Sequence, residues 1–339
     1  MLPEHHFPHR TVSNQDSECW PQLLIEWNSR TAAEHTAADH LLPALATANR
    51  EERLDRWFFV RKHPHWRLRY LGSISMRTEL AQLLNELHSS GDVDWWAHSF
   101  YEPEVLAFGG PAAMRTAHAL FHHDSHYLLA YVARQNTIDP LRELGRRELG
   151  VLLISTLLRA AGQDWYEQGD VWHHVAVHRQ AARSPGGERQ RARMHRLMTA
   201  DAARTDGPLA ILQDWIHAFT TAGRELADHA RYGRLERGLR AILAHHTMFV
   251  FNRLGLSAHE QLALAELATE VVMNEHSLPS AGAGDGDVAH GRSGSSERDH
   301  GTSELDVEDR SRRSDIQAVE PSDGEGASSH GRCGDVEVR

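Results

Sequence analysis

Five side chains in this sequence have the types needed for proton transfer beside an anion-binding group: Arg67, Arg69, Tyr101, Glu104 and His245. A carboxylate and an imidazole exchange protons, a phenol can donate one, and a guanidinium can hold a carbonyl oxygen or an oxyanion. Arg67 and Arg69 are two residues apart, so on a strand they project from the same face. These residues predict a site that holds a carbonyl group and moves protons around it.

Structural explanations exist for the same residues. The two arginines could instead form ion pairs with Glu102 or Glu104, and Glu104 could be a carboxylate that is simply buried against an arginine. Tyr101 could be a core aromatic residue at the end of a strand. The residues alone do not decide between these explanations and a catalytic role.

Histidine and methionine share one face of a helix expected near residue 250. His245, Met248 and Asn252 fall at i, i+3 and i+7, so a cavity lined by one of them is expected to be lined by all three. His246 lies instead among apolar residues and is expected to be a core histidine.

A metal site was considered because the chain has 26 histidines. Residues 122–126 (HHDSH) and the pair His174 and His178 have spacings that zinc could use. Neither group comes with a cysteine or a well-placed third ligand, and no glycine-rich phosphate loop is recognisable. We therefore expect no metal and no cofactor.

The elements that position the candidate residues follow a βαββαβ order. Strand-like runs occupy residues 22–27, 56–61, 66–71 and 93–101, and helical apolar spacing occupies residues 33–45 and 76–87. This order predicts a ferredoxin-like unit, in which two helices pack on one face of an antiparallel sheet. The fold class is therefore expected to be α+β.

The rest of the folded part is expected to be helical. A helix should begin at Pro111, and further helices are expected at 141–161, 208–230, 234–253 and 258–274. Between residues 163 and 204 the pattern weakens, and residues 183–187 (RSPGG) are expected to form an exposed loop.

Composition divides the chain into three parts. Residues 279–339 hold 14 acidic residues against 7 arginines, which gives −7 of the net charge of −11. This segment has one leucine and no aromatic residue, so it cannot bury enough apolar surface to fold. We expect an extension at 1–19, one catalytic α+β domain at 20–276 (sheet-bearing at 20–110, helical at 111–276), and a disordered acidic tail at 277–339.

Several classes of protein are disfavoured. Two cysteines are too few for a disulfide framework or a thiolate metal site. No apolar run is long enough for a membrane span or a signal peptide, so the cytoplasm is the expected compartment. The folded part has no basic stripe for nucleic acid.

Five motifs in order resemble one known family. They are residues 57–62 (WFFVRK), 66–70 (WRLRY), 101–110 (YEPE followed by FGG), 120–125 (LFHHDS) and 252–255 (NRLG). In this order they resemble the thiopeptide-type bacteriocin biosynthesis family, which is similar to the C-terminal elimination domain of lantibiotic dehydratases. The resemblance runs from about residue 20 to residue 274.

The resemblance implies two possible activities, and one of them needs groups that this chain lacks. Elimination members expel glutamate from glutamylated Ser or Thr, which requires cations for the leaving carboxylates and a base for the α-proton. The family pattern has an arginine where this chain has Ala107 and a histidine where it has Met248. Elimination is therefore disfavoured, and both positions are expected to face one cavity.

The other implied activity joins two dehydroalanines of one peptide in a formal 4+2 aza-cycloaddition. Loss of water and of the leader amide then gives the pyridine of a thiopeptide and closes its macrocycle. Holding the two alkenes together supplies much of the catalysis. An apolar wall at Ala107 and Phe108 would suit a thiazole-rich peptide. Asp124 and Ser125 could brace the start of a helix or could contact the substrate.

The resemblance also implies a partner, a ribosomally made precursor with a leader and a core that contains thiazoles and dehydroalanines. Other enzymes of such a pathway are further possible partners. Trp165 and Trp172, in the weakly patterned segment, could form an aromatic groove for the leader or could be core residues. A third hypothesis is a silent subunit that only presents the peptide.

Overall fold

The computed structural model describes residues 20–134, 144–179, 187–202 and 209–273 of the 339-residue chain. The extension at 1–19 and the acidic tail expected from residue 277 lie outside the described residues. Most of the loop expected at 183–187 lies outside them as well. Within the described ranges, no helix combines the length and apolar character that crossing a bilayer requires.

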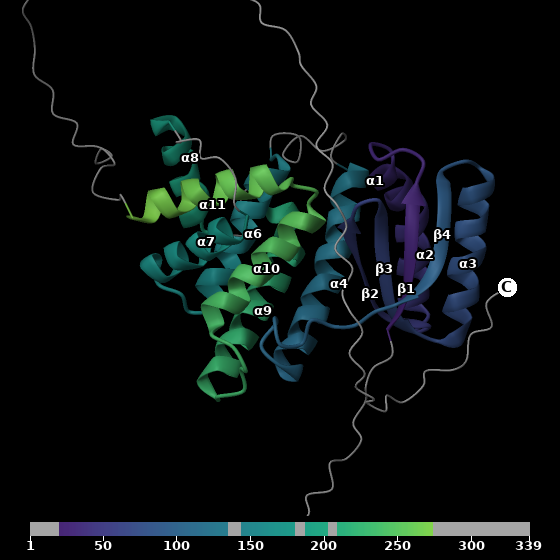
Figure 1. Ribbon diagram of the computed structural model, residues 1–339, viewed down its shortest axis with the longest axis horizontal. Helices are drawn as coiled ribbons and strands as arrows, with labels where there is room; N and C mark the ends of the chain where they lie inside the picture. The colour runs from purple at the N-terminus through teal and green to yellow at the C-terminus, as the bar shows by residue number, and fades with distance from the viewer. Residues whose placement is uncertain (1–19, 135–143, 180–186, 203–208, 274–339) are drawn as a thin grey trace, which may run out of the picture. The chain divides into compact units, whose positions relative to one another are not determined.

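The first part of the chain forms a four-stranded antiparallel sheet in the order β2-β3-β1-β4 (Figure 1). Its strands are β1 (Pro21–Trp27), β2 (Leu54–Lys62), β3 (His65–Gly72) and β4 (Val93–Phe100). One helical segment connects β1 to β2, and another connects β3 to β4. The predicted α+β class with a ferredoxin-like βαββαβ order is confirmed.

The two connecting helices cover one face of the sheet. The first is continuous through α1 (Ala33–Thr36), a π-helical turn (Ala37–Leu41) and α2 (Leu42–Arg50), and the second is α3 (Ile74–Ser89). Alternate strand residues such as Leu23, Ile25 and Leu68 are buried in the same core as these helices. The helices leave the opposite face, which carries Arg67 and Arg69, free for the site.

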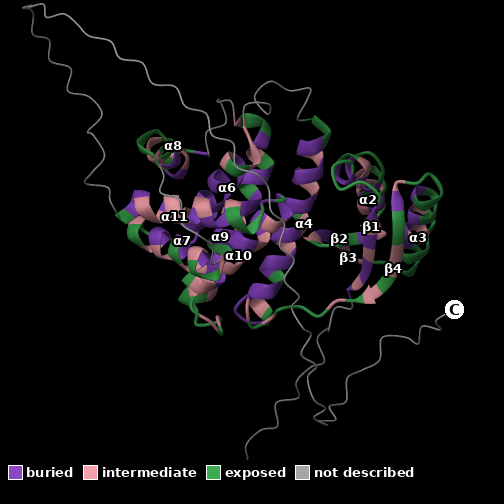
Figure 2. Ribbon diagram, turned by 45° about the horizontal axis from the view of Figure 1, so that its top comes forward, coloured by how far each residue is buried: buried purple, intermediate pink, exposed green. Residues whose placement is uncertain are grey.

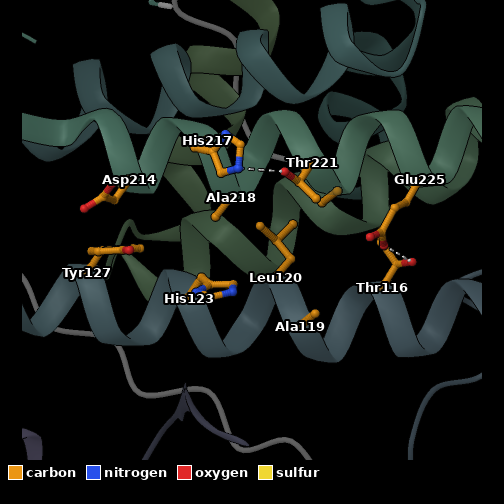
Figure 3. Close-up of a pocket in the computed structure, with 11 residues that line it drawn as sticks. Thr116, Ala119, Leu120, His123, Tyr127, Asp214, His217, Ala218, Thr221 and Glu225 are labelled. Carbon is orange, nitrogen blue, oxygen red and sulfur yellow. Dashed lines mark hydrogen bonds between the residues drawn. The ribbon is translucent and has the colours of Figure 1, made fainter. Parts of the chain in front are cut away.

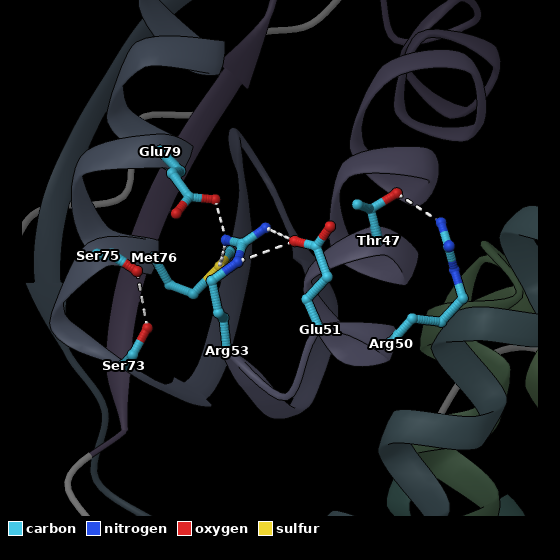
Figure 4. Close-up of polar contacts among 8 residues, drawn as sticks. All are labelled: Thr47, Arg50, Glu51, Arg53, Ser73, Ser75, Met76 and Glu79. Carbon is cyan, nitrogen blue, oxygen red and sulfur yellow. Dashed lines mark hydrogen bonds and ion pairs between the residues drawn. The ribbon is translucent and has the colours of Figure 1, made fainter.

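Arg53, just before β2, ties this strand to α3 (Figure 4). Its guanidinium forms ion pairs with Glu51 and with Glu79 of α3. The N–H of Ser73 also donates to the carbonyl of Arg53 at 2.8 Å. These contacts fix the edge of the sheet where the chain passes from β3 into α3.

The rest of the described chain is helical. Its helices are α4 (Pro111–Arg134), α6 (Arg146–Ala160), α7 (Trp165–Arg179), α8 (Glu188–Thr199), α9 (Gln213–Arg231) after a 3-10 turn (Ala210–Leu212), α10 (Leu239–Arg253) and α11 (Ala258–Met273). The helices expected at 111, 141–161, 208–230 and 258–274 are present, mostly with shorter bounds.

Two expectations for this part need correction. The weakly patterned segment at 163–204 contains two helices, α7 and α8; α8 buries little beyond Met194 and Met198, so its sequence lacks a strong apolar stripe. The helix expected from residue 234 begins only at Leu239, because residues 236 and 237 bond instead to the loop after β4.

Helix α4 seals the β2 edge of the sheet, and the two lie side by side in Figures 1 and 2. The N–H of Phe59 donates to Oγ of Ser125 at 3.2 Å, and the N–H of Trp57 lies 3.2 Å from Nδ1 of His122. An unpaired strand edge is otherwise a template for pairing with another chain. Side chains of α4 therefore take the place of a fifth strand at this edge.

Candidate functional site

Glu104 and His245 form a carboxylate–imidazole pair. Oε2 of Glu104, in the loop after β4, lies 2.9 Å from Nε2 of His245 on α10, and the two side chains are 55% and 18% exposed. This hydrogen bond lowers the pKa of Glu104, and the charges of Arg69 and Lys62 lower it further. The pair can exchange protons with a bound molecule and remains reachable from solvent.

The loop that carries Glu104 is held from two sides. Nη1 of Arg237 donates to the carbonyl of Ala107 at 3.0 Å, and the N–H of Glu236 donates to the carbonyl of Gly109 at 3.0 Å. Gly109 has φ of 90°, and a Cβ there would lie 2.3 Å from Cδ1 of Ile242. Only glycine fits this approach between loop and helix, which fixes the position of Glu104 relative to α10.

Arg69 lies deeper than Glu104. It is 8% exposed, its Nε donates to Oε1 of Gln22 at 2.8 Å, and its Cζ lies 3.9 Å from the centre of the Tyr101 ring. Burial lowers the pKa of Arg69 to about 10, so the guanidinium is still charged at neutral pH. Its position is therefore set by an amide and an aromatic face.

Tyr101 forms a buried hydrogen bond with a histidine. Its hydroxyl lies 3.1 Å from Nε2 of His118 on α4. Burial raises the pKa of Tyr101 to about 12 and lowers the pKa of His118 to about 4, so both groups are neutral at pH 7. The neutral phenol can donate to this ring nitrogen, which fixes the tyrosine ring beneath Arg69.

Arg67 is the more accessible of the two arginines. It lies on the same face of β3 as Arg69, opposite Leu24 of β1 and Val60 of β2, and it is half-buried. Among the described residues it has no hydrogen bond or ion pair, and neither arginine forms an ion pair with Glu102 or Glu104. This geometry favours a binding role for Arg67 over the alternative of a structural ion pair.

Phe108 forms the apolar floor of the pair. Its ring centre lies 4.7 Å from that of His245 and 5.0 Å from that of Phe249. It belongs to a second core cluster with Trp20, Phe58, Met114, Ala117 and Phe121. Phe108 therefore supports the imidazole from below, and it is itself almost fully buried.

Ala107 and Met248 are not seen to share a cavity. Met248 is buried in the main core, whereas Ala107 is half-buried in the loop and contributes its carbonyl to Arg237. Residues three apart on a helix differ in direction by about 60°. His245 can thus meet Glu104 while Met248 turns inward, so the expectation that both positions face one cavity is not supported.

Asp124, Ser125 and Asn252 lie in structural contacts. Asp124 is fully buried between Nε of Arg253 at 2.5 Å and Nε1 of Trp215 at 2.9 Å. Ser125, also fully buried, holds the edge of β2. Oδ1 of Asn252 accepts from Gln261 at 2.9 Å. The first two have no surface for a peptide, which argues against the substrate contact expected of them.

Of the two alternatives for Trp165 and Trp172, an aromatic groove or core packing, the contacts favour core packing. Trp172 is 0% exposed, and its ring stacks on Phe251 in the helical core at 6.0 Å. Trp165 packs against the same core and contacts the ring of His195 at 5.6 Å. Both residues belong to helix packing, since α7 is a core helix and not an exposed segment.

His246 occupies the position expected of a core histidine. It is fully buried, with its ring centre 4.9 Å from that of Phe108, and neither ring nitrogen has a hydrogen-bond partner among the described residues. Burial, with the charges of His245 and Arg253, lowers its pKa to about 3. It is therefore neutral at pH 7.

Two residues near the site, Gln22 and His118, were not predicted to belong to it. Gln22 bridges the site by binding both Arg69 and the carbonyl of Phe100, at 2.8 and 3.0 Å. Both are polar residues in otherwise apolar patterns, at the start of β1 and in the buried stripe of α4. Such a residue indicates a buried partner, because unpaired polar groups are costly to bury.

A separate cavity of about 300 Å³ lies between α4 and α9 (Figure 3). His123 and Tyr127 of α4 face Asp214 and His217 of α9 across it. No candidate site residue lines this cavity. Within the described ranges, no three histidine, cysteine or carboxylate side chains come together in a way that could hold a metal ion.

The chain belongs to the family described as lantibiotic biosynthesis dehydratase C-term, which matches residues 20–272. Among curated proteins, no sequence matches the chain. The family assignment and the βαββαβ sheet beside a helical part agree with the resemblance that the five motifs carry.

Three solved structures share this fold. The tRNA-dependent lantibiotic dehydratase MibB from Microbispora sp. 107891 has a TM-score of 0.59 and 20% identity, over 78% of this chain and 29% of that one. TsrL has a TM-score of 0.54 and 16% identity, over 76% of this chain and 95% of that one. TbtD, the pyridine synthase from thiomuracin biosynthesis, has a TM-score of 0.50 and 14% identity, over 76% of this chain and 98% of that one. At these identities the likeness is one of fold, and this chain spans less than a third of MibB.

Proposed function

We propose that this chain is a peptide-modifying enzyme that forms a pyridine ring in a ribosomally made precursor peptide. Two dehydroalanines join: the amide beside one tautomerises, giving a 2-azadiene, and the alkene of the other adds across it. Loss of water and then of the leader peptide as its amide aromatises the ring. The sum of these steps needs no oxidant, no reductant and no cofactor.

The observation that carries this proposal is the small number of cations available to a leaving glutamate. Arg69 is already bound by Gln22 and covered by Tyr101, and Ala107 supplies no charge, so Arg67 is the accessible guanidinium of this group. A free glutamate has two carboxylates, and each needs charge-assisted hydrogen bonds to leave. Cycloaddition produces no such anion.

The roles of the residues follow from their positions. Arg67 is placed to hold the amide oxygen as it gains negative charge on tautomerisation. Glu104 is placed to accept the amide proton, and His245 to pass that proton to the departing hydroxyl. Tyr101 and Phe108 act by positioning Arg69 and His245, since both are largely covered by protein.

Elimination of glutamate is the alternative, and the likeness in fold to MibB favours it. In that reaction His245 would take the α-proton of the glutamylated residue and Arg67 would hold one carboxylate. The second carboxylate would have to rely on Lys62, an exposed ammonium near Glu104 and not the guanidinium that the family pattern places at residue 107, so we rank this alternative below cycloaddition. A subunit that only presents a peptide has no need of the Glu104–His245 pair.

One experiment separates these functions. The purified chain is incubated with a leader-bearing peptide that carries two preformed dehydroalanines, and separately with a peptide that carries glutamylated serine. Cycloaddition gives free leader amide and a macrocycle from the first peptide, whereas elimination gives loss of glutamate from the second. Mass spectrometry that finds both peptides unchanged would overturn both enzymatic proposals. A peptide with alanine at both reacting positions is the control.

A further inference from the structure

The open face of the sheet has three rows of side chains that run across the strands. The first row contains Ser99, Gln22, Arg69 and Phe58, and the second contains Ala97, Leu24, Arg67 and Val60. The third contains Trp95, Glu26, His65 and Lys62: Trp95 pairs with Glu26, and His65 pairs with Lys62. The candidate site uses residues of the first two rows. The third row has no role in that site.

Trp95 is the most unusual member of the third row. It is 45% exposed, although a tryptophan on a sheet face is normally covered. The register between β1 and β4 shifts just beyond it, so that Trp27 pairs with Val93 and Asp94 is left over. This bulge lets Val93 enter the core while Trp95 projects from the open face, and bulges often re-aim a side chain in this way.

Two polar side chains lie beside Trp95 on that face. The ring of His65 lies 5.2 Å from the ring of Trp95, and Nε2 of His65 lies 3.5 Å from Oε2 of Glu26. Both side chains are partly exposed. The result is an indole face flanked by an imidazole and a carboxylate, next to Arg67 in the second row.

The spacing of the rows matches that of an extended peptide. Successive rows are two residues apart along each strand, about 6.7 Å, and side chains on one face of an extended peptide repeat at the same interval. A peptide laid along the open face with its reacting residue beside Arg67 in the second row would therefore place the residue two positions away at the third row, about 6.7 Å distant.

We propose that Trp95, with His65 and Glu26, is a specificity subsite that binds a planar aromatic or azole ring of the substrate peptide, two residues from the reacting dehydroalanine. The inference rests on the proposed function insofar as that function supplies a peptide substrate. The indole face stacks on the ring, and the His65–Glu26 pair hydrogen-bonds its heteroatom or the adjacent backbone. The ring thus sets the register of the peptide relative to Arg67 and Arg69.

Binding and turnover are measured separately so that the inference and the proposed function can fail independently. The probes are fluorescein-labelled ten-residue peptides with one dehydroalanine and a thiazole placed two, four or six residues from it, and a peptide with alanine in place of thiazole. Fluorescence anisotropy gives Kd for wild type, Trp95→Ala and Trp95→Phe. Phe100→Ala is the matched control, because Phe100 is 79% exposed on the same strand but projects from the other face.

We expect wild type to bind the peptide with thiazole at two residues most tightly. Trp95→Ala should raise the Kd of that peptide about fivefold and the Kd of the alanine peptide less than twofold. Trp95→Phe should recover most of the lost affinity. With the full substrate, KM should rise similarly and kcat should stay unchanged. Equal losses for thiazole and alanine peptides, no preference for position two, or no binding by wild type would each overturn the inference. If the peptides bind as expected but the full substrate is not converted, only the proposed function would be overturned.

Discussion

Nε2 of His245 and Oε2 of Glu104 lie 2.9 Å apart although 141 residues separate them in the sequence. One comes from the loop after the last strand and the other from the penultimate described helix, so the pair exists only when the sheet and the helical part are packed together. Its formation therefore reports on the correct assembly of the candidate site.

Removal of either member of this pair should abolish most of the activity without unfolding the protein. We expect His245→Ala and Glu104→Gln each to lower kcat by about 10² to 10⁴, the range for loss of a general acid or base. For Glu104→Gln the free energy of unfolding should change by less than about 1 kcal/mol, because Glu104 is more than half exposed. Mass-spectrometric rates and urea melts measure both quantities, with His173→Ala on α7 as the control. Full activity in both variants would exclude the pair from catalysis.

Gly109→Ala should damage the site by moving its loop. Every L-residue is strained at a φ of 90°, and the new Cβ would also lie 2.3 Å from Cδ1 of Ile242. Gly91→Ala is the matched control, because Gly91 has φ of 84° and nothing within 4 Å of the new Cβ. We expect about 1 kcal/mol of destabilisation at Gly91 and about 1–3 kcal/mol more at Gly109, from urea unfolding. Equal losses of stability in the two variants would show that the loop moves to accommodate the new Cβ without cost.

Breaking the buried Asp124–Arg253 pair should lower the free energy of unfolding more than replacing both of its members does. Asp124→Asn leaves the Arg253 guanidinium buried without its partner, so we expect a loss of about 3–5 kcal/mol in the free energy of unfolding. The double variant Asp124→Leu with Arg253→Met should recover much of that loss. Arg240→Ala, which breaks an exposed pair with Asp170, should cost less than about 1 kcal/mol and serves as the control. A loss near zero for Asp124→Asn would contradict this assignment.

Buried histidines should make the protein sensitive to acid. The pKa values of His118, His122 and His246 fall from 6.5 to about 4, 4 and 3 because burial disfavours the charged ring. Below pH 6.5 the unfolded chain therefore binds more protons than the folded one, and stability decreases as the pH falls from about 6.5 to about 4.

One of these histidines can be tested alone. His246→Leu replaces a ring with no described hydrogen-bond partner, so stability at pH 7.5 should be close to wild type. Between pH 7.5 and 5.0 this variant should lose about 2 kcal/mol less than wild type, as measured by urea unfolding at each pH. Replacing the exposed His173 by asparagine is the control. An unchanged pH dependence in His246→Leu would show that the buried ring does not govern acid stability.

The strands and α3 could be predicted because local spacing decides them. The short apolar run of β1 and the i, i+4 leucines of α3 both appear directly in the sequence, and the structure follows them. The start of α10 could not be predicted, because residues 236 and 237 are helix-compatible. They bond instead to a loop about 130 residues earlier.

The types of residue in the site could be predicted from the sequence, but the burial of each residue could not. The sequence marks Glu104 and His245 as separate candidates, and only the fold shows that they touch. Asp124 and Trp172 are candidates of the same kind and lie fully buried, because a motif records which side chains occur and not how far each lies from solvent. The sequence places Trp95 in a strand and no more, since its exposure depends on a bulge that local spacing does not mark.

The two edges of the sheet differ in a way that limits how the protein can assemble with other chains. At β2, the serine and histidine of α4 bind the strand's own amides, so this edge is closed to any additional strand. At β4 no described strand or helix takes that place, and the sheet ends beside Trp95. Growth of the sheet by a strand from another molecule is therefore one-sided. A peptide or a second copy that extends it must enter next to the third row, in competition with whatever occupies the open face.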